Sequence, residues 1–267
     1  MDLGVRDRGY VIFGGTRGIG LATASALAAE GANVALVGRD AQRAEEMAVS
    51  LEGVHPARVI GLPGDVNIEG EAERIVALAR EEFGGLRGLA VTTGLGRRGQ
   101  QTISDADDSD WGHTFTDVFL GTVHACRAVL PVLVEGGGGA IVTTGAYSVR
   151  APKSYQAPYT SMKAAVVNLT KNIAKSFGPE GVRANCVCPG VTESETLSAM
   201  RARVARERGW REDETLERIM TEDWGMRVAL GRPGTTAELG DVMAFLLSER
   251  ASFLTGATIN VDGGTDF

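Results

Sequence analysis

The chain has 267 residues, 43% of them hydrophobic, and a formal net charge of −7 at pH 7. The acidic balance and the lack of a basic stripe argue against a nucleic-acid-binding protein. No apolar run reaches the roughly 18 residues of a membrane-spanning helix, and the first residues carry no apolar signal core. We therefore expect a soluble cytoplasmic protein with one domain over residues 1–267 and with no nucleic-acid or membrane partner.

Three cysteines are too few for a disulfide framework. We expect Cys186 and Cys188 to alternate between the faces of a strand as half-buried core thiols. This interpretation argues against a metal site at these thiols, and we expect no metal site elsewhere.

The first predicted unit is a strand, a glycine-rich turn and a helix. The strand covers residues 10–13, the helix covers residues 21–30, and the turn contains Gly14, Gly18 and Gly20. Glycines let the backbone approach a pyrophosphate closely, and a helix N-terminus offers that anion unpaired N–H groups. The unit therefore favours a dinucleotide-binding opening, although an ordinary glycine-rich β-turn would use the same residues.

Apolar strands and amphipathic helices alternate along the rest of the chain. Further strands are expected at residues 33–37, 59–62, 86–93, 140–144 and 258–261, with one more after a loop over residues 177–185. Helices are expected at residues 41–51, 68–83, 111–133 and 238–247, and from Tyr159 onward. This alternation predicts a Rossmann-like, doubly wound, parallel α/β sheet with helices on both faces and strand order 3-2-1-4-5-6-7.

The end of the second strand decides between the two nicotinamide cofactors. NAD-specific folds usually place a carboxylate there for the ribose 2′-OH, but this position is Gly38. Arg39 follows it, and Arg17 lies inside the glycine turn. Two guanidinium groups can flank a 2′-phosphate, whereas two solvated surface arginines are the alternative. We expect NADP(H).

Tyr159 and Lys163 lie one helical turn apart on one face of a helix. Free tyrosine has a pKa near 10; a neighbouring ammonium favours tyrosinate, and an adjacent nicotinamide cation would add to this effect. Tyr159 could therefore give or take a proton nearer neutrality. Such a pair occurs by chance in many helices, but this one follows the fifth predicted strand, where a functional interpretation is favoured.

These motifs resemble the short-chain dehydrogenase/reductase family over almost the whole chain, from Gly9 to Gly264. The resemblance implies that Tyr159 is the acid/base and that Lys163 tunes it and binds ribose. It also implies that Asp65 accepts from adenine, although capping of a helix near Asn67 is an equal interpretation. The implied cofactor-binding residues are Gly14, Thr16, Arg17, Gly18, Ile19, Gly20, Arg39, Asp65, Val66, Thr93, Gly94, Tyr159, Lys163, Pro189, Gly190 and Val191.

The chain departs from the family pattern at several positions. The family's catalytic serine corresponds to Ala146, its relay asparagine to Val118, and two further asparagines to Val91 and Thr92. A hydroxyl two residues to either side could replace the serine if the backbone bulges at Gly145. The candidate substrate-contacting residues are Thr144, Ala146, Tyr147, Ser148, Tyr155 and Trp224.

Residues 193–230 are longer than a simple connection, and two short amphipathic helices are expected there. We interpret them as a substrate lid with Trp224 and Met226 as apolar contacts, and residues 96–108 as the rim of the active-site mouth. The expected function is hydride transfer between NADP(H) and a carbonyl or secondary alcohol of a small molecule. The open alternative is a protein of this fold that binds NADP(H) as a non-redox enzyme, sensor or scaffold. The resemblance also implies a homo-oligomer, either a tetramer or a dimer.

Overall fold

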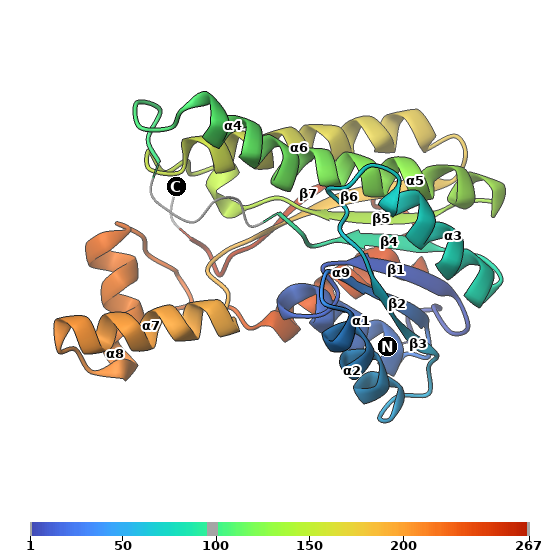
Figure 1. The fold of residues 1–267 in the computed structure, drawn as a ribbon, viewed down its shortest axis with the longest axis horizontal. Helices are drawn as coiled ribbons and strands as arrows, with labels where there is room; N and C mark the ends of the chain where they lie inside the picture. Colours follow the sequence, from blue (N-terminus) through green and yellow to red (C-terminus); the bar gives the residue numbers. More distant parts are fainter. Residues whose placement is uncertain (1, 95–100, 266–267) are drawn as a thin grey trace.

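Among the described residues, seven parallel strands form one sheet at the centre of the molecule (Figure 1). The computed structural model describes residues 2–94 and 101–265, so part of the predicted rim lies outside the described residues. The order β3-β2-β1-β4-β5-β6-β7 confirms the predicted Rossmann-like topology. The strands are β1 Gly9–Phe13, β2 Asn33–Gly38, β3 Val59–Pro63, β4 Gly88–Val91, β5 Gly139–Thr144, β6 Val182–Pro189 and β7 Thr258–Val261.

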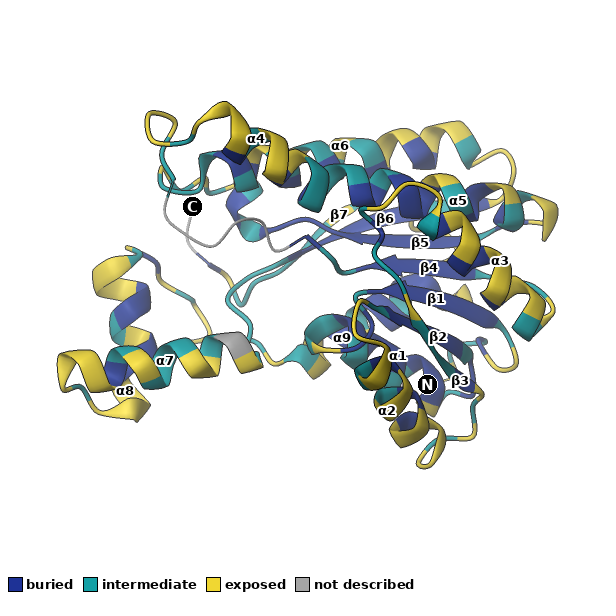
Figure 2. Cartoon of the chain, viewed as in Figure 1, coloured by how far each residue is buried: buried dark blue, intermediate teal, exposed yellow. Residues whose placement is uncertain are grey.

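Helices cover both faces of the sheet. One face carries α1 Gly18–Ala29, α2 Ala41–Glu52 and α9 Thr236–Leu247, and the other carries α3 Glu71–Phe83, α5 Gly121–Glu135 and α6 Ala157–Phe177. Within β1, Tyr10 and Ile12 pack under the face that carries α1, α2 and α9. Val11 and Phe13 pack under the opposite face. Figure 2 shows the strands buried between the helical layers. Burial on both faces explains why the strands read as continuous apolar runs.

The winding of the sheet reverses between β1 and β4. β1 pairs with β2 on one side and with β4 on the other. In open α/β sheets, ligands bind outside the carboxyl ends of the strands at such a switch point. The residues that follow β1, β4, β5 and β6 therefore define the region of the candidate site.

Several predicted boundaries differ from the structure, among them the starts of β6 and α3. β6 begins inside a predicted loop, because Val182 and Ala184 are buried and pair with β5. α3 begins at Glu71 after Gly70, so no helix starts near Asn67. Local turn residues suggested both boundaries, but pairing and burial determine them.

The predicted long helix contains a π-helical segment. α4 Asp108–Thr114 leads into π-helical residues Phe115–Leu120 and then into α5. By length and composition alone, the stretch Asp108–Glu135 could cross a membrane, with a hydropathy of 1.5 over an 18-residue window. However, 56% of that window is buried, where α5 packs on the sheet. Packing in the core accounts for this apolar stretch.

Cys186 and Cys188 share one face of β6, because residues two apart on a strand point the same way. They are 0% and 1% exposed and pack with Val166 of α6. The expectation that these thiols alternate between faces, half-buried, was therefore wrong.

The lid segment, residues 193–230, follows β6. It contains α7 Glu195–Arg208, α8 Glu212–Arg218 and the π-helical residues Ile219–Asp223, and Figure 1 shows α7 and α8 extending away from the layered body. The Trp210 ring lies 4.6 Å from the Arg208 guanidinium and 3.9 Å from that of Arg218. A bridge between Thr192 and Gly234 closes the base of the segment. The lid segment is therefore a braced helical pair on a narrow base.

Candidate active site

The glycine turn after β1 leaves room for a ligand on one side. Gly14 and Gly18 have φ angles of 81° and 55°, in the left-handed region. A Cβ on Gly20 would lie 2.2 Å from the Gly14 carbonyl oxygen, whereas a Cβ on Gly18 would meet no atom within 4 Å. The turn is therefore tight against α1 and open at Gly18, which suits an anion at the helix N-terminus.

Thr92, directly after β4, supports this turn. Its hydroxyl donates to the carbonyl oxygen of Phe13 at 3.0 Å. Its Oγ1 would also lie 2.7 Å from a Cβ on Gly14 and 2.5 Å from one on Gly20. Thr92 therefore links β4 to the end of β1, at one of the positions where the resemblance places an asparagine. The departure is visible in the sequence, but this role of Thr92 is not.

Gly38, at the end of β2, lies against Thr16. A Cβ on Gly38 would lie 2.6 Å from Thr16 Cγ2 and 2.7 Å from Thr16 Oγ1. Thr16 is only 5% exposed, and its β-branched side chain has few alternative rotamers. Arg17, the residue before α1, and Arg39 are exposed at this corner. The corner therefore has positive charge and no space for a side chain at position 38.

Arg43 belongs to the same corner and was missed by the sequence analysis. Asp40 caps α2 and accepts from the Arg43 backbone N–H at 3.1 Å. The Arg43 Nε donates to the Thr16 carbonyl oxygen at 3.0 Å. The available signal was a basic residue three positions after an aspartate N-cap, which is common on surface helices.

Tyr159 and Lys163 lie one turn apart on α6, at the carboxyl ends of β4 and β5. Lys163 Nζ is 5.8 Å from the centroid of the Tyr159 ring. It donates to the carbonyl oxygens of Thr144, at 2.9 Å, and Thr93, at 3.5 Å. Lys163 therefore ties the ends of two strands to α6.

Burial shifts the pKa of both side chains. Lys163 is 3% exposed, and burial lowers the pKa of its ammonium to about 8. Burial, with smaller contributions from Tyr147 and Cys188, raises the pKa of Tyr159 above its ordinary value. In the protein alone, burial outweighs the ammonium, so the Tyr159 pKa lies above its ordinary value; the combined effect of the ammonium and a nicotinamide cation stays a prediction. At neutral pH Tyr159 is a protonated phenol.

Thr144 uses its hydroxyl inside the sheet. Its Oγ1 is buried and donates to the Val91 carbonyl oxygen at 2.8 Å. The Gly145 N–H donates to the Val187 carbonyl oxygen at 2.8 Å, so the ladder between β5 and β6 continues past Thr144. The backbone therefore does not bulge at Gly145.

Ser148 and Ala146 do not present a hydroxyl to the site in this structure. Ser148 is 1% exposed, and its Oγ accepts from Thr160 Oγ1 on α6 at 3.2 Å. Ala146, at the family's serine position, is also buried. The two hydroxyls considered as replacements for the serine, those of Thr144 and Ser148, are therefore both hydrogen-bonded within the fold.

Tyr147 contacts the lid segment. It begins a short 3₁₀ turn, Tyr147–Val149, after Ala146. Its hydroxyl donates to Met226 Sδ at 3.1 Å. Met226 is fully buried; its expected role as an apolar substrate contact stays a prediction. The apolar cluster that joins the lid segment to the sheet edge comprises Tyr147, Val191, Leu197, Leu216, Met220, Trp224, Met226 and Val228.

Thr93, Gly94 and Val118 meet beside Lys163. A Cβ on Gly94 would lie 2.9 Å from Val118 Cα in the π-helical segment, so glycine permits this close approach. The Val118 carbonyl oxygen accepts from Thr122 Oγ1 at 3.0 Å. Thr93 Oγ1 is buried without a hydrogen-bond partner among the described residues. An orphaned hydroxyl at this position is the kind of group that a ligand satisfies.

Asp65 and Val66 lie in the turn after β3. Asp65 Oδ1 accepts from the Asn67 N–H at 3.0 Å, which forms a local turn. It does not cap α3, whose N-cap is Gly70. The Val66 carbonyl oxygen contacts His124 Nδ1 at 2.9 Å. This turn is thereby held against α5.

Pro189, Gly190 and Val191 end β6 at the base of the lid segment. A Cβ on Gly190 would lie 2.6 Å from Asp262 Cα. The Val191 carbonyl oxygen accepts from the Gly234 N–H at 2.9 Å.

Tyr155 lies elsewhere, before α6, and its carbonyl oxygen accepts from the Gln101 N–H at 2.7 Å.

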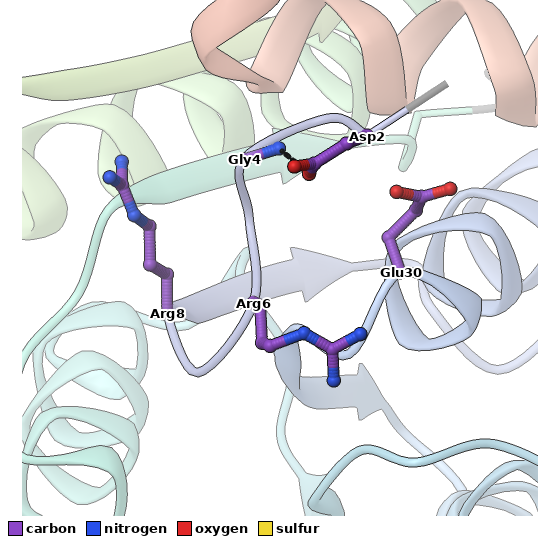
Figure 3. A pocket seen from close by; sticks show the side chains of 5 residues that line it. All are labelled: Asp2, Gly4, Arg6, Arg8 and Glu30. Atoms are coloured by element: carbon purple, nitrogen blue, oxygen red, sulfur yellow. Dashed lines mark hydrogen bonds between the residues drawn. The ribbon is translucent and has the colours of Figure 1, made fainter.

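A separate hollow of about 360 Å³ lies at the amino end of β1 (Figure 3). Arg8 immediately precedes β1, so this hollow faces away from the carboxyl ends that carry Tyr159 and Lys163. It is lined by Asp2, Gly4, Arg6, Arg8 and Glu30.

The family model for enoyl-(acyl carrier protein) reductase matches residues 14–266. The chain is 33% identical to 2-(S)-hydroxypropyl-CoM dehydrogenase 3 of Xanthobacter autotrophicus, with 97% of both chains covered. It is 29% identical to 2,3-dihydro-2,3-dihydroxybenzoate dehydrogenase of Bacillus subtilis, over 98% of this chain and 97% of the relative.

A solved structure shows a similarity to another oxidoreductase over nearly the whole chain. L-sorbose reductase from Gluconobacter frateurii, in complex with NADPH and L-sorbose, superimposes with a TM-score of 0.91 at 29% identity. The match covers 99% of this chain and 98% of the reductase. The protein therefore belongs to the short-chain dehydrogenase/reductase family.

Proposed function

We propose that the protein is an NADP(H)-dependent oxidoreductase that interconverts a carbonyl compound and a secondary alcohol, with Tyr159 and Lys163 at the reacting end. Its family and the similar dehydrogenases and reductases support hydride transfer between alcohols and ketones in general. The finer proposal rests on one observation: Lys163 joins Tyr159 to the ends of β4 and β5, beside the orphaned Thr93 hydroxyl.

The residues present fit a nicotinamide dinucleotide. The turn open at Gly18 suits a pyrophosphate at the start of α1. Thr93 Oγ1 and Lys163 Nζ supply adjacent polar groups for the nicotinamide ribose. When bound, the nicotinamide gives or accepts the hydride.

The corner at the end of β2 supports the phosphorylated cofactor. Gly38 has no carboxylate for a ribose 2′-OH, and Thr16 leaves no space for one. Arg17 and Arg39 can bind a 2′-phosphate by charge-assisted hydrogen bonds. The similar L-sorbose reductase holds NADPH in its solved structure.

Tyr159 would donate the proton to the substrate oxygen during reduction. Its raised pKa keeps the phenol protonated at neutral pH. Lys163 is held by the Thr144 carbonyl and, with a pKa of about 8, is mostly charged at pH 7. Its charge would stabilise the tyrosinate that is left behind.

Tyr147 is the side chain we assign to the role of the missing serine. The hydroxyls of Thr144 and Ser148 are engaged with the scaffold. Tyr147 donates to the thioether of Met226, a weak acceptor that a substrate oxygen can replace. The Tyr147 phenol also contributes to the raised pKa of Tyr159, so the two phenols lie within electrostatic reach of each other.

A substrate panel tests the redox function. NADPH oxidation would be followed with L-sorbose and other ketones, and NADP⁺ reduction with the matching alcohols. We expect turnover of at least one pair, and a loss of about 10²–10⁴-fold in kcat for Tyr159→Phe. NADPH binding without any turnover, and without any effect of Tyr159→Phe, would favour the sensor or scaffold function instead.

A rescue experiment tests the role of Tyr147. We expect Tyr147→Phe to lower kcat by about 10²–10³-fold, as for removal of an oxyanion donor. Adding Ala146→Ser to that variant should restore much of the loss, because the serine returns a donor at the family's position. A Tyr147→Phe enzyme with the kcat of wild type would contradict this assignment. So would a double variant whose kcat does not exceed that of Tyr147→Phe alone.

We also propose that the chain forms a homodimer or homotetramer. Phe115 on the long helical stretch, and Phe253 and Leu254 near β7, are exposed large apolar side chains. These side chains are available to pack against a second copy of the chain, as the resemblance to the family implies. Light scattering at micromolar concentration would contradict this proposal by showing a monomer.

A further inference from the structure

Arg43 connects the proposed cofactor corner to the lid segment. Its Nε donates to the Thr16 carbonyl oxygen at 3.0 Å, and its Nη2 donates to Glu195 Oε1 at 2.9 Å. Glu195 is the first residue of α7. One guanidinium therefore contacts both the glycine turn and the start of the lid helix, although Arg43 and Glu195 are 152 positions apart in the chain.

The guanidinium is held at the edge of that corner. The Asp40 cap fixes the first turn of α2, and the bond to Thr16 fixes the direction of the side chain. The Arg43 side chain is 30% exposed, so part of it faces solvent. Arg17 and Arg39 occupy the same corner, and Gly38 adds no side chain between them.

The Glu195 carboxylate marks a position that an anion can occupy beside Arg43. Its side chain is 74% exposed, so the ion pair contributes little stability and is easily exchanged. A phosphate monoester carries more charge and more acceptor oxygens than a carboxylate. It can therefore displace Glu195 from the guanidinium.

We propose that Arg43 is a third ligand of the cofactor's 2′-phosphate, and that this phosphate competes with Glu195 for it. NADP(H) then frees the first turn of α7, whereas NAD(H), which lacks the phosphate, leaves the contact in place. The inference rests on the proposed NADP(H) specificity. It gives the lid segment a means of sensing which cofactor is bound.

The release would be local. Ser194 still caps α7, accepting from the Leu197 N–H at 3.2 Å. The Thr192–Gly234 bridge and the Tyr147–Met226 contact still hold the base and the far side of the lid segment. Because coupling between two sites is reciprocal, removing the Glu195 charge must tighten NADP(H) binding if the two anions compete.

Cofactor titration tests the competition without any substrate. Dissociation constants for NADPH and NADH would be measured by fluorescence for wild type, Arg43→Gln, Glu195→Gln and the double variant. We expect Arg43→Gln to weaken NADPH about tenfold or more and NADH much less, because NADH loses only the brace to Thr16. Glu195→Gln should tighten NADPH about two- to fivefold, but not when Arg43 is also replaced. The matched control is the exposed Arg80–Glu135 pair, whose neutralisation should change neither constant.

Hydrogen exchange of α7 gives an independent measurement. At saturation, the first turn should exchange faster with NADPH than with NADH, and Glu195→Gln should abolish the difference. The competition is overturned if Glu195→Gln has the dissociation constants of wild type, or if it changes the NADPH and NADH constants equally. Either result leaves the proposed use of NADP(H) intact. A wild type that binds NADH as tightly as NADPH overturns both the cofactor proposal and this inference.

Discussion

The contact between Thr16 and Gly38 predicts that the usual change toward NAD(H) fails when it is made alone. Gly38→Asp supplies the carboxylate that binds a ribose 2′-OH. Its Cβ, however, would lie 2.6 Å and 2.7 Å from Thr16 Cγ2 and Oγ1. Thr16 is buried and stiff at χ1, so the glycine turn itself would have to move. Both cofactors should then bind more weakly.

The structure also sets the size of the effect and its remedy. Overpacking of this kind costs about 1–3 kcal/mol, which corresponds to a roughly 5- to 140-fold loss of affinity if the turn moves on binding. If the free protein bears the cost, the melting temperature falls by roughly 2–12 °C. Thr16→Ala removes both close atoms and leaves Thr16 Cβ, 3.2 Å from the added Cβ. The double variant should therefore regain stability and bind NADH better than Gly38→Asp does.

The assay is a double-mutant cycle of Gly38→Asp and Thr16→Ala, with NADH and NADPH titrations and thermal melts. We expect the two changes to be strongly non-additive, because they share one contact. If Gly38→Asp alone melts like wild type and binds NADH as well as the double variant does, the steric reasoning is refuted.

Three further predictions concern neighbouring residues. The pKa of Lys163 is lowered to about 8 in the folded protein, so the unfolded chain binds more protons than the folded chain between about pH 8 and 10.5. Wild type should therefore gain on the order of 2–3 kcal/mol over Lys163→Met as pH rises through that range; parallel urea-unfolding curves at all pH values would contradict this. Thr92→Val should cost about 1 kcal/mol and weaken both cofactors, because the brace to Phe13 is lost; unchanged titrations would exclude this role. Tyr159, whose pKa is raised, should make alcohol oxidation rise with pH from about 7 to about 9, because more tyrosinate forms, while carbonyl reduction stays level because the phenol remains protonated; an oxidation rate that does not change with pH over this range would oppose this.

Much of the fold was readable from sequence because each central strand is buried on both faces. Tyr10–Phe13 form a continuous apolar run that is bounded by glycines, and that pattern suffices for a buried parallel strand. The start of β6 was not readable. Gly178 and Gly181 suggest a loop, whereas pairing of Val182 with Gly139 extends the strand.

The candidate site was readable only where spacing along one element decides it. Tyr159 and Lys163 share a helix, so their relation follows from the helical repeat. Thr92 and Arg43 act across the fold: their bonds to Phe13 and Thr16 join segments 79 and 27 positions apart. The direction of the Thr144 hydroxyl likewise depends on Val91 of the neighbouring strand, which no local pattern encodes.

With Tyr159 in its proposed role, the site would favour carbonyl reduction over alcohol oxidation at neutral pH. Oxidation would need a base at Tyr159, but burial raises the pKa of that phenol. Reduction needs an acid, which a protonated phenol already is. Because Ala146 stands where the family has a serine, one hydrogen-bond donor to the substrate oxygen would be missing. The proposed reaction would therefore depend more on the phenols of Tyr159 and Tyr147. The proposed 2′-phosphate site is consistent with this direction, because the protein would then combine the cofactor and the proton donor that a reductase uses.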